Sequence, residues 1–244
     1  MEIVIHKKIN VKNAILVVGF PGIGSVGKIA AEYFIAKSKA QKVADIFFED
    51  FPPEVIIDQN GLTSLFKAEL FLVKDKKTFL VLTGNSQPLS PNGMHTFCTE
   101  IMDFLEDKIS QVITFAGYGV GVLVKEPKIH GAASNTKIKK DFEKLGIKFG
   151  LGVGSIIGLA GLFVGYSQKK GIDAVCLMGE THGQILQDPL AAKIVLKAFC
   201  DRFGLKLDFS DLEKNIKEFN EALTKIQEIQ REASSKPPTF NYIR

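Results

Sequence analysis

The chain has 244 residues, of which 45% are hydrophobic and 24% are charged, and its 31 lysines and arginines face 27 aspartates and glutamates, a net charge of +4. This composition excludes a disordered chain, a collagen-like repeat and a small disulfide-stabilised protein. The basic residues are spread along the whole sequence and tryptophan is absent, so we expect no nucleic-acid partner. A chain of this length also buries a sufficient core without a metal ion.

Apolar runs alternate with amphipathic stretches through residues 1–208, which we interpret as one core domain. The runs predicted as strands are residues 14–18, 43–48, 79–82, 111–116 and 174–178. The stretches predicted as helices are residues 24–37, 93–108, 138–145, 155–169 and 189–203. Strands that are apolar on both faces require helices on both faces. The pattern therefore predicts an α/β fold with a mostly parallel central sheet.

Residues 52–72 interrupt this alternation and are predicted to form a hairpin insertion. Asn60 and Gly61 are a favoured pair for a tight turn between antiparallel strands. The turn would join residues 54–58 to residues 62–71.

Glycine is the compositional outlier, with 22 residues in 244, or about 9% against a usual ~7%. Gly22, Gly24 and Gly27 form a G-x-G-x-x-G pattern after a predicted strand, which is typical of a dinucleotide-binding turn. With Lys28 they nearly match a phosphate-binding loop, but Ile29 stands where a magnesium-binding hydroxyl belongs. Two interpretations stay open: a nucleotide or nucleoside site, or a turn in which glycine permits close packing.

Glu180 and His182 follow the predicted strand 174–178, where α/β proteins usually bind ligands. Standing two residues apart, they could face one cleft as acid and base. No serine lies in a nucleophile-elbow context, and no second carboxylate marks a metal site. We therefore expect no catalytic residue and no metal, and keep Glu180 and His182 with Gly22, Gly24, Gly27 and Lys28 as an alternative ligand site.

Residues 149–168 carry no charge and resemble a membrane span in length. Their many glycines lower both hydrophobicity and helix propensity. We predict a buried helix preceded by a glycine-rich loop, and no membrane partner.

Cys98, Cys176 and Cys200 lie in apolar or helical stretches without a C-x-x-C pair, so we predict buried, reduced thiols. The first residues lack the basic and apolar regions of a signal peptide. The expected location is the cytoplasm.

The chain changes character after residue 208. Five apolar residues recur there at steps of three and four on a charged background, which predicts an amphipathic helix over residues 209–232. They are Leu212, Ile216, Phe219, Leu223 and Ile226. This apolar seam needs a partner, which is either the core domain or a second copy of the chain.

Residues 233–244 are predicted to form an extended docking tail. The segment Ser-Ser-Lys-Pro-Pro-Thr cannot continue a helix, and the last five residues turn aromatic and apolar. Because a chain end is normally frayed and polar, Phe240, Tyr242, Ile243 and Arg244 are candidate partner-binding residues. Folding of the tail onto its own domain is the alternative.

Six short motifs follow one another along the chain. They are residues 19–27 (GFPGIGSVG), 49–53 (EDFPP), 84–88 (GNSQP), 117–119 (GYG), 158–162 (GLAGL) and 178–183 (MGETHG). Together they resemble the archaeal branch of the proteasome assembly chaperone 2 family, and the resemblance covers about residues 1–230.

This resemblance implies a three-layer α/β/α domain, similar to the nucleoside phosphorylase fold, that works as a homo-oligomeric chaperone and not as an enzyme. The family implies three to five copies and no cofactor, although some members have been labelled ATP-grasp-like. The implied partners are proteasome α subunits, whose intersubunit pockets receive a C-terminal tail with tyrosine next to last.

The tail departs from that ending at one place. Tyr242 is third from the end of the chain, which shifts the terminal carboxylate by about 3.3 Å relative to the ring. Either the tail docks in a different register, or it engages another partner.

Overall fold

Four parallel strands form the centre of the main sheet. The computed structural model describes residues 1–150 and 154–235, without the side chains of 223 and 226–235. The central strands, in spatial order, are β7 (Thr78–Gly84), β2 (Ala14–Gly19), β8 (Ile109–Gly119) and β11 (Asp173–Thr181). Every residue of β2 is buried, because helices cover both faces. The predicted α/β sheet is confirmed, and four of its five predicted strands are these.

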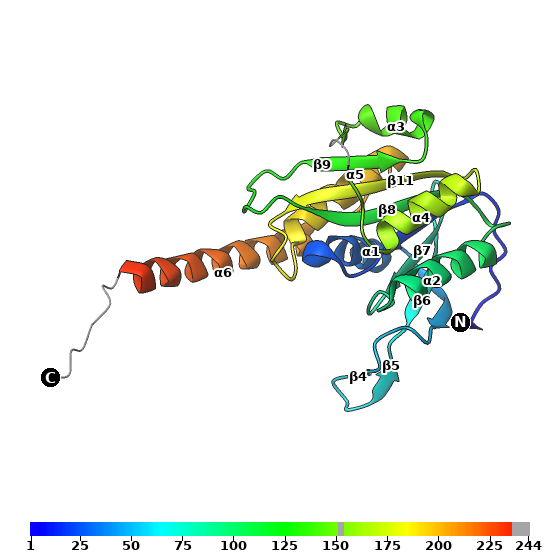
Figure 1. The fold of residues 1–244 in the computed structure, drawn as a ribbon, viewed down its shortest axis with the longest axis horizontal. Helices are drawn as coiled ribbons and strands as arrows, with labels where there is room; N and C mark the ends of the chain where they lie inside the picture. The colour runs from blue at the N-terminus through cyan, green and yellow to red at the C-terminus, as the bar shows by residue number, and fades with distance from the viewer. Residues whose placement is uncertain (151–153, 236–244) are drawn as a thin grey trace. The chain divides into compact units, whose positions relative to one another are not determined.

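Antiparallel pairs extend this centre on both sides into a nine-stranded sheet (Figure 1). Beyond β7 lie β6 (Ala68–Lys74), β3 (Gln41–Phe47) and β1 (Glu2–Ile5). Beyond β11 lie the antiparallel β9 (Ile129–Ala133) and then β10 (Lys148–Phe149), which runs parallel to β9. Among these five, the apolar pattern predicted β3 as a separate strand and merged part of β6 with the hairpin. It missed the other three because β1 is mostly exposed, β10 has two residues, and β9 contains few large apolar side chains.

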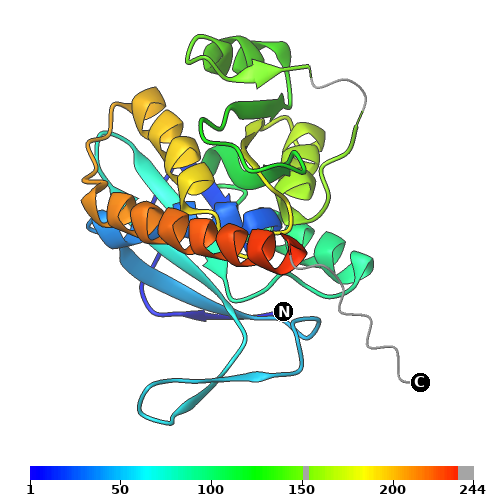
Figure 2. The same cartoon turned by 90° about the vertical axis from the view of Figure 1, so that its left-hand side faces the viewer.

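Helices cover both faces of the sheet and give the expected three-layer sandwich (Figures 1 and 2). On one face α1 (Val26–Lys37) packs against α5 (Pro189–Phe203), and on the other α2 (Pro91–Phe104) packs against α4 (Leu159–Lys169). The short helix α3 (Thr136–Glu143) lies against β9 and β10. Chain order and packing thus follow the predicted alternation of strands and helices.

Two of these helices begin where a polar residue precedes proline. The Ser90 side chain accepts a hydrogen bond from the Gly93 N–H at the start of α2. The Asp188 carboxylate accepts one from the Ala191 N–H at the start of α5. Proline suits the first helical position because its missing N–H would have no partner there.

Aromatic clusters fill both layers between helices and sheet. Phe34 of α1, Phe79 of β7 and Phe199 of α5 meet edge to face, with ring centroids 5.2 to 5.6 Å apart. On the opposite face Phe20 and Phe97 pack edge to face at 5.8 Å. Such pairs add specific geometry to the burial of apolar surface that stabilises the domain.

The predicted hairpin is present but shorter than expected. β4 (Val55–Ile57) and β5 (Thr63–Leu65) form a separate two-stranded sheet that projects from the domain (Figure 1). The Asp58 carboxylate accepts hydrogen bonds from the backbone N–H groups of Asn60 and Leu62 and shapes the turn. The prediction of one strand over residues 62–71 was wrong, since the chain leaves the hairpin after Leu65 and joins the main sheet as β6.

The C-terminal helix α6 (Ser210–Ser235) belongs to a second unit, Asp208–Arg244, and Met1–Leu207 forms the first. Asp211 and Glu213 lie in its first turn, where negative charge is favourable. The helix continues past residue 232, where the apolar pattern predicted its end.

The charge-free segment 149–168 forms no continuous long helix, since α4 begins only at Leu159 and its buried face includes Phe163 and Val164. In the part of the chain that the structure describes, no helix combines the length and apolar character needed to cross a membrane.

The turn from β2 into α1 brings its backbone very close to β8. A Cβ atom at Gly27 would lie 2.2 Å from the carbonyl oxygen of Phe115, well inside van der Waals contact. Gly24, within the 3-10 turn Ile23–Ser25, has a φ of 59°, a conformation that favours glycine. The packing interpretation therefore accounts for both of these glycines.

We expect Gly27→Ala to lower the free energy of unfolding by about 1–3 kcal/mol, because the added methyl group must displace backbone atoms. Chemical denaturation followed by circular dichroism measures the change. Gly165→Ala is the matched control: Gly165 lies in α4 with open space around its missing Cβ atom, so alanine should stabilise the chain by about 0.5–1 kcal/mol. A Gly27→Ala variant as stable as the wild type would contradict the packing role.

Candidate functional site

A cavity of about 900 Å³ opens at the carboxyl ends of β2 and β8. Gly22 and Gly27 of the glycine turn contribute to its wall. Most of the remaining wall is apolar and aromatic, and includes Phe20, Met94, Phe115, Tyr118, Phe149 and Leu159. The other four candidates for the alternative ligand site, Gly24, Lys28, Glu180 and His182, do not line it.

The Lys28 ammonium is engaged by two partners within the protein. Its Nζ atom donates a hydrogen bond to the Gly84 carbonyl at 3.1 Å and forms an ion pair with Glu32 at 3.2 Å, one turn along α1. The lysine therefore ties α1 to the end of β7. Its interactions favour a structural role over phosphate binding.

Polar side chains in the cavity wall include Gln87, Tyr118, Lys139 and Ser155. Both ends of the Gln87 amide are engaged. Its Nε2 atom donates to the Pro21 carbonyl at 2.6 Å, and its Oε1 atom accepts from the Leu159 N–H at 2.9 Å. The amide thus links the glycine turn to the start of α4. What the cavity offers a ligand is mainly apolar contact.

Glu180 pairs with a histidine that the sequence motif did not indicate. Its Oε1 atom lies 2.8 Å from Nε2 of His130, and its Oε2 atom accepts from the Lys128 N–H at 3.0 Å. Burial by itself raises the pKa of Glu180, but these hydrogen bonds outweigh it and hold the pKa below its ordinary value. The His130 ring also packs against the Tyr118 ring at 4.8 Å.

The hydrogen-bond partner of the Glu180 carboxylate is thus His130, and His182 has a different environment. His182 lies beyond the end of β11, and its carbonyl accepts from the Gly121 N–H at 3.2 Å. Its Nδ1 atom is buried without a hydrogen-bond partner among the described residues. His130 escaped prediction because it comes from β9, 50 residues away in sequence from Glu180.

The metal-ligating side chains and the cysteines were the remaining candidates for chemistry. Within residues 1–150 and 154–235, no cluster of three or more His, Cys, Asp or Glu side chains is placed to hold a metal ion. Cys98, Cys176 and Cys200 are buried free thiols, as predicted. Burial raises the pKa of Cys176 and of Cys200 to about 12, so these thiols stay protonated near neutral pH and are weak nucleophiles.

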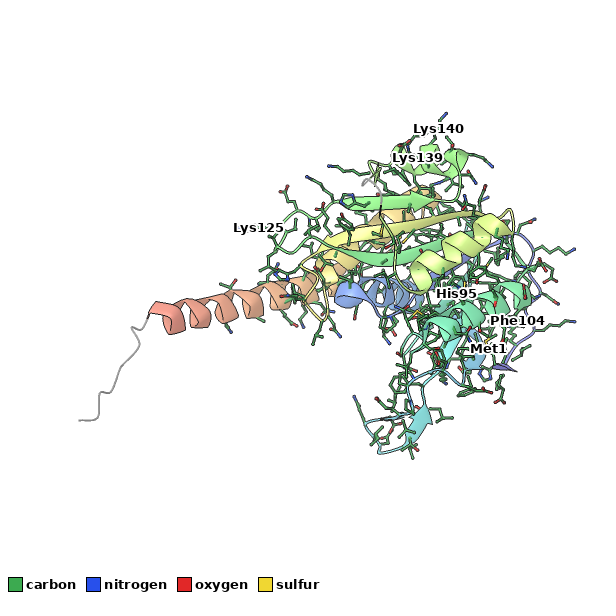
Figure 3. All side chains as sticks on the ribbon, viewed as in Figure 1. Met1, His95, Phe104, Lys125, Lys139 and Lys140 are labelled. Carbon is green, nitrogen blue, oxygen red and sulfur yellow. The ribbon has the colours of Figure 1, made fainter. Side chains whose placement is uncertain are left out.

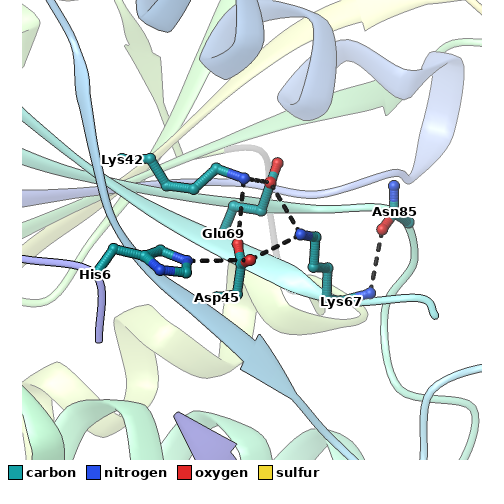
Figure 4. A network of polar contacts seen from close by, with 6 residues as sticks. All are labelled: His6, Lys42, Asp45, Lys67, Glu69 and Asn85. Carbon is teal, nitrogen blue, oxygen red and sulfur yellow. Dashed lines mark hydrogen bonds and ion pairs between the residues drawn. The ribbon is translucent and has the colours of Figure 1, made fainter. Parts of the chain in front are cut away.

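A second polar cluster joins β1, β3 and β6 (Figure 4). The Asp45 carboxylate lies 2.8 Å from Nζ of Lys67, 3.1 Å from Nε2 of His6 and 3.2 Å from Nζ of Lys42. Glu69 completes the cluster through ion pairs with both lysines. Burial raises the pKa of Asp45, and the hydrogen bonds from Lys67, His6 and Lys42 lower it further than burial raises it.

This cluster links neighbouring strands near one edge of the sheet, which is a structural role. Lys67 is additionally fixed through its backbone N–H, which donates to Oδ1 of Asn85 at 3.1 Å. The signal for it in the sequence was Asp45, a carboxylate inside the apolar run 43–48, since such a charge requires partners.

The five residues of the predicted apolar seam all fall on α6. Leu212, Ile216 and Phe219 have described side chains, whereas those of Leu223 and Ile226 lie outside the described part. The candidate tail residues Phe240, Tyr242, Ile243 and Arg244 also lie outside the described residues. The seam and the tail remain predictions of the sequence.

A family model described as the PAC2 family matches residues 16–227. The chain belongs to the PAC2 family. An uncharacterized protein of Methanocaldococcus jannaschii is 36% identical over 238 residues, which are 96% of this chain and 92% of that protein. The resemblance carried by the six sequence motifs is thereby confirmed.

Two solved structures from Pyrococcus furiosus share the fold of this PAC2-family chain. PbaB, an archaeal proteasome activator, matches with a TM-score of 0.86 at 30% identity, covering 93% of this chain and 98% of PbaB. PbaA, an archaeal homolog of proteasome-assembly chaperone, matches with a TM-score of 0.77 at 26% identity, covering 95% and 94%. The predicted fold class is confirmed over nearly the whole chain.

The Glu180–His130 pair predicts a pH dependence of stability. The folded-state pKa of Glu180 lies below its unfolded value. The contribution of ionised Glu180 to the free energy of unfolding is therefore fully present above the unfolded pKa, and it is lost as pH falls through the folded pKa. Glu180→Gln should therefore lower the free energy of unfolding by about 1–2 kcal/mol at pH 7, with a difference from wild type that shrinks below about pH 4. Urea denaturation across this pH range measures it.

The exposed carboxylate Glu126 gives the control for this measurement, and Glu126→Gln should leave the free energy of unfolding within about 0.5 kcal/mol of wild type. A Glu180→Gln difference that stays constant from pH 7 to pH 3 would contradict the assignment.

Proposed function

We propose that this chain is a homo-oligomeric, non-enzymatic chaperone that binds proteasome α subunits through its C-terminal tail and assists or regulates proteasome assembly in the cytoplasm. The similarity to PbaB, an archaeal proteasome activator, carries the proposal, because at 30% identity it extends over 93% of this chain and 98% of PbaB. The similarity to PbaA, a homolog of proteasome-assembly chaperone, supports the same class of function.

The tail composition supports the mode of binding. Phe240 and Tyr242 are aromatic anchors of the kind that dominate the contact energy of small interfaces. A five-residue contact is weak alone, but several tails in one oligomer act together and raise the overall affinity. The offset of Tyr242 from the next-to-last position is accommodated by a docking register shifted by about one residue, or 3.3 Å.

The alternative, a nucleotide- or nucleoside-binding enzyme, has less support. Lys28 is held by Gly84 and Glu32, and Glu180 is held by His130. The cavity beside the glycine turn is lined mainly by apolar side chains. These side chains already have the protein partners that a bound phosphate or a proton-transfer reaction would have to displace.

Deletion of residues 240–244 should abolish capture of archaeal proteasome α subunits, because it removes both aromatic anchors and the terminal carboxylate. Surface-bound α subunits and interferometry measure capture, and light scattering measures the mass of the oligomer, which should not change. Tyr242→Ala should weaken capture at least tenfold, as expected for an anchor residue, and Asn241→Ala is the matched control with little effect. Unchanged capture after the deletion would remove the tail from the proposal.

Calorimetry separates the chaperone from the enzyme. Titration of the full chain with ATP, NAD and purine nucleosides should give no saturable heat, since Lys28 and Glu180 already have partners in the protein. Micromolar binding that is lost in Lys28→Ala or His182→Ala would favour the enzyme and contradict the proposal.

A further inference from the structure

The β4–β5 hairpin exposes an apolar surface that the described part of its own chain leaves open to solvent. Val55, Ile57, Leu62 and Leu65 are between 52% and 67% exposed. A two-stranded hairpin has little stability by itself in water, and exposed apolar side chains gathered in one place mark an interaction site. The hairpin is therefore a candidate for contact with another molecule.

The pairing of the hairpin strands gathers these side chains on one side. Val55 lies opposite Leu65 in the antiparallel register, and Ile57 follows two residues along β4. Because side chains alternate between the faces of a strand, Val55, Ile57 and Leu65 share a face. We call this face, together with Leu62 at the turn, the hairpin face.

The charged side chains of the hairpin segment itself are all acidic. Residues 54–66 contain Glu54 and Asp58, both exposed, and no lysine or arginine. Glu49, also exposed, lies just before the hairpin. A partner for this face should therefore combine exposed apolar side chains with basic residues.

The same chain carries a surface of that kind in the loop between β8 and β9. Val122 and Leu123 are 60% and 43% exposed. The exposed Lys125 and Lys128 follow them, with one carboxylate, Glu126, between the two lysines. We call residues 120–128 the basic loop. Figures 1 and 3 place the hairpin and Lys125 on different sides of the domain, so the loop does not cover the hairpin of its own chain.

We propose that the hairpin face of one copy docks on the basic loop of a second copy of this chain. This inference rests on the proposed homo-oligomer and gives it an interface. Apolar side chains meet in the centre, and Glu54 and Asp58 of one copy face Lys125 and Lys128 of the next. Because the two surfaces are different, the contact is head to tail, and repetition closes a ring when the rotation per copy divides a full turn.

Two single substitutions test the contact on the full chain. Ile57→Asp disables the hairpin face and leaves the basic loop intact, whereas Leu123→Asp does the reverse; both side chains are exposed, so the fold should tolerate the changes. Each variant alone should be a monomer of 26.8 kDa by light scattering. An equimolar mixture should form dimers and nothing larger, because each pair retains one intact interface and has no further one to extend.

Leu145→Asp, at an exposed leucine just after α3, is the control and should keep the wild-type mass. The proposal would be overturned if the wild type were a monomer, or if Ile57→Asp or Leu123→Asp kept the wild-type mass. We call these two substitutions the face variants. Two monomeric variants that fail to form dimers on mixing would also overturn it, and would indicate contact between like surfaces or a different partner. Circular dichroism verifies that each variant is folded.

Charge reversal gives a second, independent readout. Glu54→Lys with Asp58→Lys should weaken the oligomer at least tenfold, and so should Lys125→Glu with Lys128→Glu. All four changes in one chain should restore much of the wild-type mass, since the pairs are reversed together. Failure of this restoration would overturn the assignment of the charged pairs.

Failure of the interface is distinguishable from failure of the proposed function. Face variants keep the tail and should still capture α subunits, with an affinity lowered only by the loss of multiple tails. Tail variants keep both the hairpin face and the basic loop, and should therefore retain the mass of the oligomer. If the mass responds to the face variants and capture is indifferent to the tail, the interface stands and the tail proposal falls.

Discussion

The close approach between Gly27 and the Phe115 carbonyl determines how α1 is placed at the carboxyl edge of the sheet. A Cβ atom at position 27 would lie 2.2 Å from the Phe115 carbonyl oxygen. Only glycine therefore lets α1 begin this close to β8. The turn is then held from a second side, because the Asp188 N–H at the start of α5 donates to the Gly24 carbonyl at 2.8 Å. The glycine turn thus connects α1, β8 and α5, and a positive φ and close packing account for Gly24 and Gly27 of its motif.

This joint determines what the rest of the edge can do. Lys28 is directed to β7, Gln87 bridges Pro21 and Leu159, and Glu180 is directed to β9. In an α/β enzyme the polar groups at this edge converge on a ligand. Here they hold loops to one another and leave an apolar cavity between them. The polar side chains named here are therefore already engaged within the protein.

The elements that were predictable are those whose stability depends on local pattern. Continuous apolar runs mark the buried strands around residues 14–18 and 174–178. A polar residue before proline marks the helix that begins at Pro189. The strands β1 and β9 were missed because their pairing partners stabilise them more than their own composition does. Strand β6 was merged with the hairpin because its break near Lys67 depends on Asn85, 18 residues away.

The same limit applied to the candidate site. Glu180 was identifiable from its place after a predicted strand, and His182 was considered with it because the two stand two residues apart and could face one cleft. The register between β9 and β11 places His130 opposite Met178, two residues from Glu180 in β11, so the partner is on the adjacent strand. Periodicity identifies which residues share a face, but it carries no information about which strands are neighbours.

In the proposed oligomer, a head-to-tail interface also bears on the proposed contact of the tail with its partner. Contact between two like surfaces would produce a dimer and no larger assembly. Contact between unlike surfaces adds copies until the ring closes. One hairpin face and one basic loop in each copy are then enough to assemble a ring of several copies. Each copy then adds one tail, and the effective concentration of tails near a bound partner rises with each copy. The acidic residues around the hairpin face and the lysines of the basic loop set the register, since like charges brought together by a wrong pairing oppose it. Weak contacts at both the tail and the interface are then sufficient for stable binding of a multisubunit partner.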